Sequence, residues 1–291
     1  MKVLVTGGVG FIGTNLIKEL LKDGHKIVSI DNYSTGLKEN EQNGCTYYNS
    51  DICDCNNFDN FMDDPDLVFH LAALPRIQPS FKNPLTTFKT NVEGTLNLLD
   101  WCKEKNTPLV YAGSSSTHGG IYKNPYTFTK WQGEELCNLY SKVYSLQTAI
   151  CRFYNVYGPH QLTEGEYCTV IGIFERQKNN GEVLTITGDG QQRRDFTHVD
   201  DIVDGLIKCG LDLINENNSV ANGETFELGR GINYSINEVA NMFGGEKTYI
   251  NQKKGEVRDT LCKDSKAKEL LNWNPKRNLE DYIKKILNNV E

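Results

Sequence analysis

Several features that would place a protein in a particular class are missing from this 291-residue sequence. No apolar run approaches the roughly 18 residues that cross a bilayer, and the mean hydropathy is −0.50, so no membrane association is expected. The first residues, MKVLVTGG, carry one lysine and a short apolar stretch before the glycines. This pattern predicts a first strand and not a signal peptide. There is also no internal repeat and no low-complexity tract.

Basic residues are fewer than acidic residues. The chain has 31 Lys and Arg against 38 Asp and Glu, a net charge of −7, and a pI of about 5.4. This balance argues against nucleic-acid binding over a broad surface, but it allows a local basic pocket for a phosphate group. Apolar residues at 38% and charged residues at 24% are ordinary globular usage, and the length suits one large domain or two smaller ones.

Metal-ligand spacing is absent as well. The nine cysteines are scattered, and the only close pair is Cys53-Asp54-Cys55. A zinc site needs two CxxC-like pairs or histidines at ligand spacing, so no metal is expected. Reduced thiols in a reducing compartment are the favoured interpretation, which predicts a cytoplasmic protein.

The chain does show a regular alternation of apolar runs and amphipathic stretches. Strands are expected near 2–7, 25–31, 45–51, 66–73, 107–115 and 146–155, and helices near 11–23, 84–105 and 126–144. Near-continuous apolar strands between helices are typical of a parallel sheet covered on both faces. The predicted fold class is therefore α/β, with a Rossmann-like, doubly wound parallel sheet.

After Asn155 the pattern changes to loops and shorter elements. Further helices are expected near 169–180, 198–214, 235–243, 264–271 and 279–289. We predict a dinucleotide-binding domain over 1–155, to which 190–214 returns. A smaller, partly interleaved C-terminal substrate lobe would comprise 156–189 and 215–291.

A glycine loop follows the first predicted strand and opens the first predicted helix. Thr6-Gly7-Gly8-Val9-Gly10-Phe11-Ile12-Gly13 has the context of a phosphate-binding loop, although its spacing is GxxGxxG and not GxGxxG. Gly7 would make the tight turn, and Gly10 would let the backbone approach a pyrophosphate at the helix N-terminus. Glycine-rich turns are common, so the loop alone is weak evidence.

Asp31 ends the second predicted strand, where an acid reads the adenosine ribose hydroxyls in dinucleotide-binding domains. A carboxylate there would repel a 2′-phosphate, which favours NAD over NADP. The alternative is an Asp that only starts the turn DNYSTG. Together with the glycine loop, Asp31 predicts an NAD site.

Tyr126 and Lys130 lie four residues apart, on one face of a predicted helix. A nearby cation favours the phenolate, which helps a phenol with a pKa near ~10 to act as a base around neutrality. Upstream, Ser114, Ser115 and Ser116 follow a strand, at the edge where open α/β sheets bind ligands. The alternatives are a surface Tyr–Lys pair and an ordinary serine-rich turn, but the conjunction of features favours an enzyme site.

Segments along nearly the whole chain resemble motifs of the extended short-chain dehydrogenase/reductase family. They are VTGGVGFIG, DNYSTG, Asp51-Ile52, HLAA, TNVEGT, YTFTK, RFYNVYGP, RRDFTHVDDI and KKGEVRDT. Within this family the chain resembles the NAD-dependent nucleotide-sugar epimerases and dehydratases, of the UDP-glucose 4-epimerase type.

The resemblance implies a role for each matching residue. Ser114, Tyr126 and Lys130 would be catalytic. NAD would contact Gly7, Gly10, Phe11, Ile12, Asp31, Asn32, Ser34, Thr35, Gly36, Asp51, Ile52, Leu71, Ala72, Ala73, Asn91, Tyr126, Lys130 and Tyr154. The UDP-sugar would contact Ser114, Ser115, Asn155, Val170, Thr185, Arg194, Lys253 and Arg258, with the cations on its diphosphate.

The implied reaction is epimerisation at carbon 4 of a UDP-hexose, either UDP-glucose and UDP-galactose or their N-acetylamino forms. Tyr126 would take the proton of the 4-hydroxyl, bridged by Ser114, while hydride passes to tightly held NAD. The 4-keto sugar would then rotate about its diphosphate link and receive hydride on its opposite face. Lys130 would bind the nicotinamide ribose and lower the pKa of Tyr126.

Other activities remain open. Family dehydratases and decarboxylases carry an acid directly after the strand-end hydroxyl, whereas residues 112–120 contain no carboxylate; this favours the epimerase. The alternatives are another nucleotide-sugar epimerase, a reductase or dehydratase of the family, or a catalytically silent NAD-binding protein. Silent relatives typically lose the Tyr or the Lys, and this chain has both.

The chain departs from the family pattern in two places. Only twelve positions separate Ser114 from Tyr126, where most relatives have a longer loop, and His118 replaces the usual Tyr. The favoured interpretation of His118 is a turn residue without a chemical role. Lys253 stands where many relatives have Arg, so it offers a point charge and not a bidentate fork.

Family members commonly dimerise through two helices of each subunit, here 84–105 and 126–144, so a homodimer is expected. Apolar stripes at helical spacing are present on both: Leu85, Phe88, Val92, Leu96 and Leu99, and Leu136, Leu139 and Val143. From the sequence, these stripes can equally face the sheet.

Overall fold

A seven-stranded parallel sheet forms the centre of the protein in a computed structural model, which describes residues 1–54, 58–215 and 218–288. Its strand order is β11-β6-β5-β4-β1-β2-β3. The strands are β1 (Lys2–Thr6), β2 (Lys26–Asp31), β3 (Cys45–Asn49), β4 (Leu67–His70), β5 (Leu109–Ser114), β6 (Thr148–Phe153) and β11 (Thr225–Leu228). The strand order reverses between β1 and β4, and this arrangement confirms the predicted doubly wound α/β fold.

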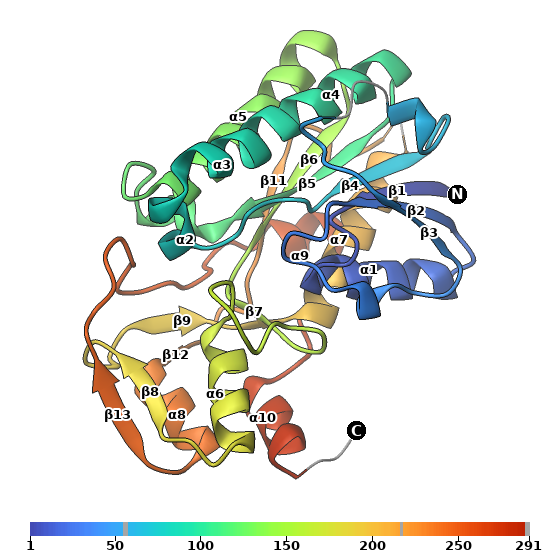
Figure 1. Ribbon diagram of the computed structural model, residues 1–291. Helices are drawn as coiled ribbons and strands as arrows, with labels where there is room; N and C mark the ends of the chain where they lie inside the picture. The colour runs from blue at the N-terminus through green and yellow to red at the C-terminus, as the bar shows by residue number, and fades with distance from the viewer. Residues whose placement is uncertain (55–57, 216–217, 289–291) are drawn as a thin grey trace.

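Helices cover both faces of this sheet (Figure 1). One face carries α2 (Ile77–Lys82), α3 (Pro84–Phe88), α4 (Gly94–Lys105) and α5 (Pro125–Tyr144), and the other carries α1 (Phe11–Lys22), α7 (Val199–Leu213) and α9 (Lys266–Leu271). Each face has its own apolar core, with Val3 and Val5 in one and Leu4 in the other. Because successive strand residues point to opposite faces, strands buried on both sides must be apolar throughout.

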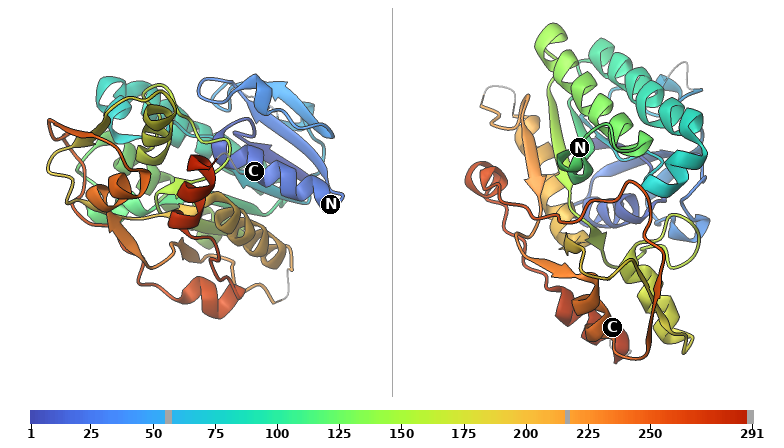
Figure 2. Two further views of the ribbon diagram at one scale, coloured as in Figure 1. Left: turned by 90° about the horizontal axis from the view of Figure 1, so that it is seen from below. Right: turned by 90° about the vertical axis from the view of Figure 1, so that its left-hand side faces the viewer.

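A smaller lobe lies at the carboxyl ends of the strands (Figures 1 and 2). It has three two-stranded sheets: β7 (Val156–Tyr157) with β10 (Thr197–His198), β9 (Arg193–Asp195) with β12 (Asn233–Ser235), and β8 (Leu184–Thr187) with β13 (Lys247–Ile250). Helices α6 (Val170–Asn179), α8 (Ile236–Phe243) and α10 (Leu279–Leu287) share a third core with them.

The predicted domain boundaries are wrong in two segments. Strand β11 was expected in the lobe as part of 215–291, but it pairs in parallel with β6 and completes the central sheet. Residues 193–195 were expected to return to the first domain, but as β9 they pair with β12 in the lobe. In both cases hydrogen bonding to a strand distant in sequence decides the placement, and local sequence does not report such pairing.

Smaller differences concern the helices. The predicted helix over 84–105 is α3 and α4 joined by a π-helical turn, Lys89–Glu93. Short 3-10 turns occur at Lys38–Asn40, Phe58–Asn60 and Ser115–Gly119. The predicted end of the last helix, residue 289, and Cys55 lie outside the described residues.

Two negative findings apply to residues 1–54, 58–215 and 218–288. None of their helices is both long enough and apolar enough to cross a bilayer. Nor do they contain a group of three or more His, Cys, Asp or Glu side chains placed to hold a metal ion.

Candidate active site

A cavity of about 560 Å³ opens between the carboxyl ends of the central strands and the lobe. In open α/β sheets, ligands bind at this edge, where the strand order reverses. Most of the predicted site residues line it: Gly7, Gly10, Phe11, Ile12, Asp31, Asn32, Ser34, Thr35, Asp51, Ile52, Leu71, Ala72, Ala73, Ser114, Ser115, Tyr126, Lys130, Asn155, Val170, Thr185, Arg194 and Lys253.

The glycine loop brings backbone to the cavity wall at the start of α1. Gly7 has φ +77°, and a Cβ there would lie 2.8 Å from the backbone nitrogen of Ala72. Only glycine fits a left-handed conformation with so close a neighbour. The helix starts after Gly10 without a side-chain cap or an acid in its first turn. Its free N–H groups and positive dipole end therefore suit an anionic phosphate.

Asp31 stands at the end of β2, at the side of the cavity beyond the glycine loop. Its carboxylate accepts backbone N–H groups of Val9 at 3.1 Å and Tyr33 at 2.8 Å. Burial raises the pKa of Asp31, and these hydrogen bonds offset only part of that effect. Asn32 Nδ2 donates to Asp51 Oδ2 at 2.9 Å, which ties the segments after β2 and β3 together.

The three predicted catalytic residues all line the cavity. The Tyr126 hydroxyl donates to Ser114 Oγ at 3.3 Å. Lys130, one helical turn along α5, is 4% exposed, and its Nζ lies 4.2 Å from the ring centroid of Tyr111. The predicted pair of an acidic hydroxyl and a cation on one helix face is therefore present beside a serine hydroxyl.

Burial shifts the pKa values of this pair in opposite directions. It raises the pKa of Tyr126, which the hydrogen bond to Ser114 and the charge of Arg76 only partly offset. It lowers the pKa of Lys130 to about 8. The lowered pKa predicted for Tyr126 is thus not found, because loss of solvation outweighs the hydrogen bond to Ser114 and the charge of Arg76.

Most of the predicted substrate contacts lie on the lobe side of the cavity. Asn155 Nδ2 donates to the Asp195 carbonyl at 2.9 Å and to Thr260 Oγ1 at 3.2 Å. Arg194 Nη2 lies 3.7 Å from Glu256 Oε2, and burial lowers the pKa of Arg194. Lys253 lines the cavity as well, so two cations face it from the lobe.

Arg258 makes an ion pair within the lobe in this structure. It is absent from the cavity wall, and both its Nη atoms donate to the carboxylate of Asp189 at 2.8 Å. That bidentate bond lowers the pKa of Asp189 to about 2. The partner of Arg258 in this structure is a carboxylate of its own lobe, and its contact with the diphosphate stays a prediction.

Gly36, Asn91 and Tyr154 also lie outside the cavity wall. Asn91 Oδ1 accepts the Leu74 N–H at 2.8 Å and its Nδ2 donates to Thr129 Oγ1 at 3.1 Å. It therefore supports the lining segment after β4 from behind. Tyr154 is 4% exposed and its ring stacks on that of His118.

Arg76 is a cavity residue that the sequence analysis missed. It precedes α2 with φ +99°, and its Nε donates to the Tyr167 carbonyl at 2.9 Å. Its charge acts on the Tyr126 hydroxyl. An arginine shortly after the predicted ligand-lining segment HLAA was the signal that could have drawn attention to it.

Comparison with known proteins assigns the chain to a family. Residues 3–229 match the model of the NAD dependent epimerase/dehydratase family. The chain belongs to this family. It is 30% identical to the UDP-glucose 4-epimerase of Mycolicibacterium smegmatis over 99% of this chain and 97% of that protein. It is 29% identical to UDP-glucuronic acid decarboxylase 1 of Xenopus tropicalis over 98% and 71% of the two chains.

Solved structures of this epimerase/dehydratase family share the whole fold. The crystal structure of UDP-glucuronic acid 4-epimerase from Bacillus cereus, in complex with UDP-glucuronic acid and NAD, matches with a TM-score of 0.90 and 28% identity. The match covers 100% of this chain and 99% of that one. These findings confirm the predicted family, its α/β fold and NAD as its cofactor.

Proposed function

We propose that the protein is a nucleotide-sugar 4-epimerase, acting on a UDP-hexose with NAD bound at the glycine loop. The NAD half of the site fits its ligand. Gly7 lets the loop turn tightly against the backbone of Ala72, the N-terminus of α1 would face the pyrophosphate, and Asp31 would bind the adenosine ribose hydroxyls. When bound, NAD would supply the acceptor and donor of the hydride at carbon 4 of the sugar.

The hydrogen bond between Tyr126 and Ser114 carries the proposal. Two hydroxyls 3.3 Å apart, facing a cavity, can exchange a proton with a third hydroxyl that binds between them. We assign Tyr126 as the group that takes the proton from the sugar 4-hydroxyl and later returns it, with Ser114 orienting that oxygen. Lys130, with its pKa lowered to about 8, would supply positive charge beside the reacting groups below that pH.

The absence of an acid directly after Ser114 in the sequence supports epimerisation over elimination or decarboxylation. Residues 112–120 contain no carboxylate. Two acids on the lobe side of the cavity are already paired, Glu166 with Lys82 and Glu256 with Arg194. Without an acid and a base at carbons 5 and 6, the 4-keto hexose can only be reduced again. If the sugar rotates before this reduction, the product is the 4-epimer.

A hexuronic acid is a second candidate for the sugar, and Arg76 favours it. Among the described residues, Arg76 has no carboxylate within ion-pair distance, yet it is half-buried in the wall near Tyr126. A carboxylate at carbon 5 of the sugar would lie next to the 4-hydroxyl and give this guanidinium a bidentate partner. Arg194 and Lys253 would remain for the diphosphate.

The decisive experiment uses the purified protein without added nicotinamide. We expect UDP-galactose to be converted to UDP-glucose, because the cofactor would be regenerated in every turnover. Parallel reactions with UDP-N-acetylgalactosamine and UDP-glucuronate, followed by proton NMR of the anomeric signals, distinguish the three sugars. If none of the three nucleotide sugars is epimerised in the presence of saturating NAD, the proposal is contradicted.

We also propose that the protein is a cytoplasmic homodimer. The outward apolar residues on α4 and α5 support the dimer, since Leu96 is 40% and Val143 60% exposed. The free, mostly buried cysteines support a reducing compartment.

A further inference from the structure

The turn that follows β5 carries the hydroxyls facing the substrate half of the cavity. We call Ser114–Gly119 the serine turn. Ser114, Ser115 and Ser116 line the cavity, and Ser114 Oγ lies 2.9 Å from Ser116 Oγ. Thr117 Oγ1 donates to the Ser114 carbonyl at 2.9 Å. These bonds fix the serines relative to one another but do not hold the turn to the rest of the protein.

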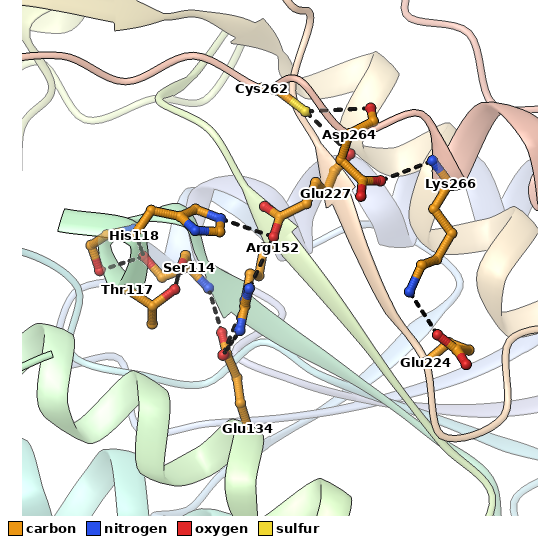
Figure 3. A network of polar contacts seen from close by, with 11 residues as sticks. Ser114, Thr117, His118, Glu134, Arg152, Glu224, Glu227, Cys262, Asp264 and Lys266 are labelled. Carbon is orange, nitrogen blue, oxygen red and sulfur yellow. Dashed lines mark hydrogen bonds and ion pairs between the residues drawn. The ribbon is translucent and has the colours of Figure 1, made fainter. Parts of the chain in front are cut away.

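Glu134 of α5 anchors the first end of the serine turn. Its Oε1 accepts the Ser114 N–H at 3.2 Å, and the residue is 1% exposed. Arg152 of β6 donates to Glu134 Oε2 from Nε at 3.0 Å and from Nη2 at 2.7 Å. From Nη1 it donates to Glu227 Oε1 of β11 at 2.9 Å. A half-buried arginine thus links two carboxylates on either side of it (Figure 3).

His118 anchors the other end of the turn to the same network. Its Nε2 lies 2.9 Å from Glu227 Oε1, and Glu227 is 7% exposed. The His118 side chain is 52% exposed, so it can exchange protons with solvent. With His118 neutral, two carboxylates face a single guanidinium; with His118 protonated, the charges of the network balance. Figure 3 shows the imidazole and Arg152 converging on Glu227.

We propose that His118 and Glu227 are positioning residues, whose ion pair pins the short serine turn to β11 so that its hydroxyls face the sugar. This inference rests on the proposed function, because the sugar is the ligand that the turn would meet. It also gives His118 a role that the sequence analysis did not expect. The pair joins a turn after β5 to the sheet's edge strand, and so replaces the hold that a longer loop would otherwise supply.

The charged groups around His118 determine how the pair responds to pH. Glu227 of β11, Arg152 of β6 and Glu134 of α5 all act on it, and Tyr154 stacks on its ring. The hydrogen bond that His118 donates to Glu227 raises the pKa of His118 more than burial and Arg152 lower it. A raised pKa means that the protonated pair is complete at low pH and is lost as pH rises through that raised pKa. Sugar binding should weaken over the same interval.

The test measures binding of two ligands to the NAD-loaded enzyme between pH 6 and 9. UDP-glucose carries the sugar that would meet the serine turn, and UDP lacks it. We expect His118→Gln and Glu227→Gln to weaken UDP-glucose binding about 10-fold at pH 6.5, to leave UDP binding unchanged, and to abolish the pH step. His118→Arg, which keeps a charged donor, should retain tight UDP-glucose binding without the pH step.

Lys266→Ala is the matched control. It removes another ion pair of the same region, Lys266 with Glu224 at 2.7 Å, which does not touch the serine turn. Its UDP-glucose affinity and pH step should equal those of the wild type. If His118→Gln and Glu227→Gln keep wild-type affinity and pH dependence, the inference is overturned. A wild type that binds UDP-glucose with the expected pH step but never epimerises it would instead refute the proposed function alone.

Discussion

At the scale of single residues, the site owes its chemistry to burial. Tyr126 and Lys130 sit where water is largely excluded, and this disfavours the charged form of each. The pKa of the phenol rises and that of the ammonium falls to about 8. Tyr126 is therefore a proton donor to Ser114. A bound ligand that brings positive charge would shift the phenol towards the base that the reaction needs.

Tyr126→Phe removes the hydroxyl and keeps the ring. We expect epimerisation to fall by about 10²–10⁴-fold, the usual contribution of a positioned acid or base. NAD content, measured from the absorbance of the released cofactor, should stay at the wild-type level. Thermal stability should change little, because the lost hydrogen bond is long at 3.3 Å. If the variant epimerises the sugar at the wild-type rate, Tyr126 is not the group that transfers the proton.

Lys130→Met tests the cost of a buried cation. The unfolded chain protonates this lysine with a pKa of 10.5 and the folded chain with one of about 8. The fold is therefore penalised at every pH below about 8, and the penalty fades as pH rises towards 10.5. We expect the variant to be inactive but more stable by about 1 kcal/mol at pH 7, after subtraction of the lost contact with the Tyr111 ring.

Urea denaturation at pH 7 and pH 10 checks this sign. The stability gain should be smaller at pH 10. Lys142→Met is the control, because Lys142 is exposed on the same helix and its substitution should leave stability unchanged. A less stable Lys130→Met variant would show that the ring contact outweighs desolvation.

The positions of site residues at strand ends were predictable from the sequence, whereas those of side chains on loops were not. Asp31 and Ser114 follow apolar runs whose carboxyl ends must meet at one edge of a parallel sheet, so their placement follows from the fold class. Arg76 and Arg258 depend on side-chain directions in irregular segments. Arg76 enters the cavity through a left-handed backbone, and Arg258 pairs with Asp189, neither of which the pattern of the sequence reports.

At the scale of elements, two glycines with positive φ flank α1, one after β1 and one after the helix, and they have different structural roles. Gly7 and Gly24 both have positive φ, +77° and +74°. A Cβ at Gly7 would press on the backbone after β4, while a Cβ at Gly24 would meet nothing within 4 Å. A side chain at Gly7 would therefore face both an unfavourable backbone conformation and a steric clash. A side chain at Gly24 would face only the unfavourable backbone conformation.

Gly7→Ala and Gly24→Ala form a matched pair. We expect Gly24→Ala to cost about 1–2 kcal/mol, the price of the left-handed conformation for an L-residue. Gly7→Ala should cost clearly more, about 3 kcal/mol or above, since backbone must also move. It should also lower NAD affinity, whereas Gly24→Ala should not. Chemical denaturation and cofactor titration measure the two effects. Equal losses of stability would contradict the steric argument.

Elements were predictable where a periodic pattern ran for many residues. The strands β1 to β6 and the helices α1 and α5 appear close to their expected positions. The short α2 was missed because IQPSFK has two turns at most and a proline. The π-helical turn before α4 was missed because it preserves the apolar stripe of a continuous helix. Strand β11 has four residues, and its place in the sheet depends on β6.

At the scale of the whole molecule, the chain passes several times between the central sheet and the lobe, and the site lies where the two meet. Strand β11 and helix α9 cover the edge and one face of the central sheet, although they follow much of the lobe in sequence. The segments between them and after them return to the lobe. Because the chain crosses between the parts several times, the cavity walls are fixed relative to each other without a large separate interface. The His118–Glu227 pair joins the turn after β5 to β11, the edge strand of the central sheet.

The outward face of α4 and α5 carries the last prediction. These helices pack side by side (Figures 1 and 2). Of the residues in the two apolar stripes, Leu99 is fully buried against the sheet, whereas Leu139 is 48% and Val143 60% exposed. Part of these stripes therefore faces the sheet, and part remains exposed, as the proposed dimer interface would require. Apolar side chains that remain in water on adjacent helices favour association with a second copy.

Leu139→Glu combined with Val143→Glu should convert a dimer into a monomer in sedimentation velocity experiments at micromolar concentration. Two carboxylates from each copy would meet across the two-fold axis, and their desolvation would oppose association. Leu211→Glu is the control, because Leu211 is 46% exposed on α7, on the opposite face of the sheet. It should sediment as the wild type does. A monomeric wild type, or a dimer broken equally by Leu211→Glu, would place the contact elsewhere.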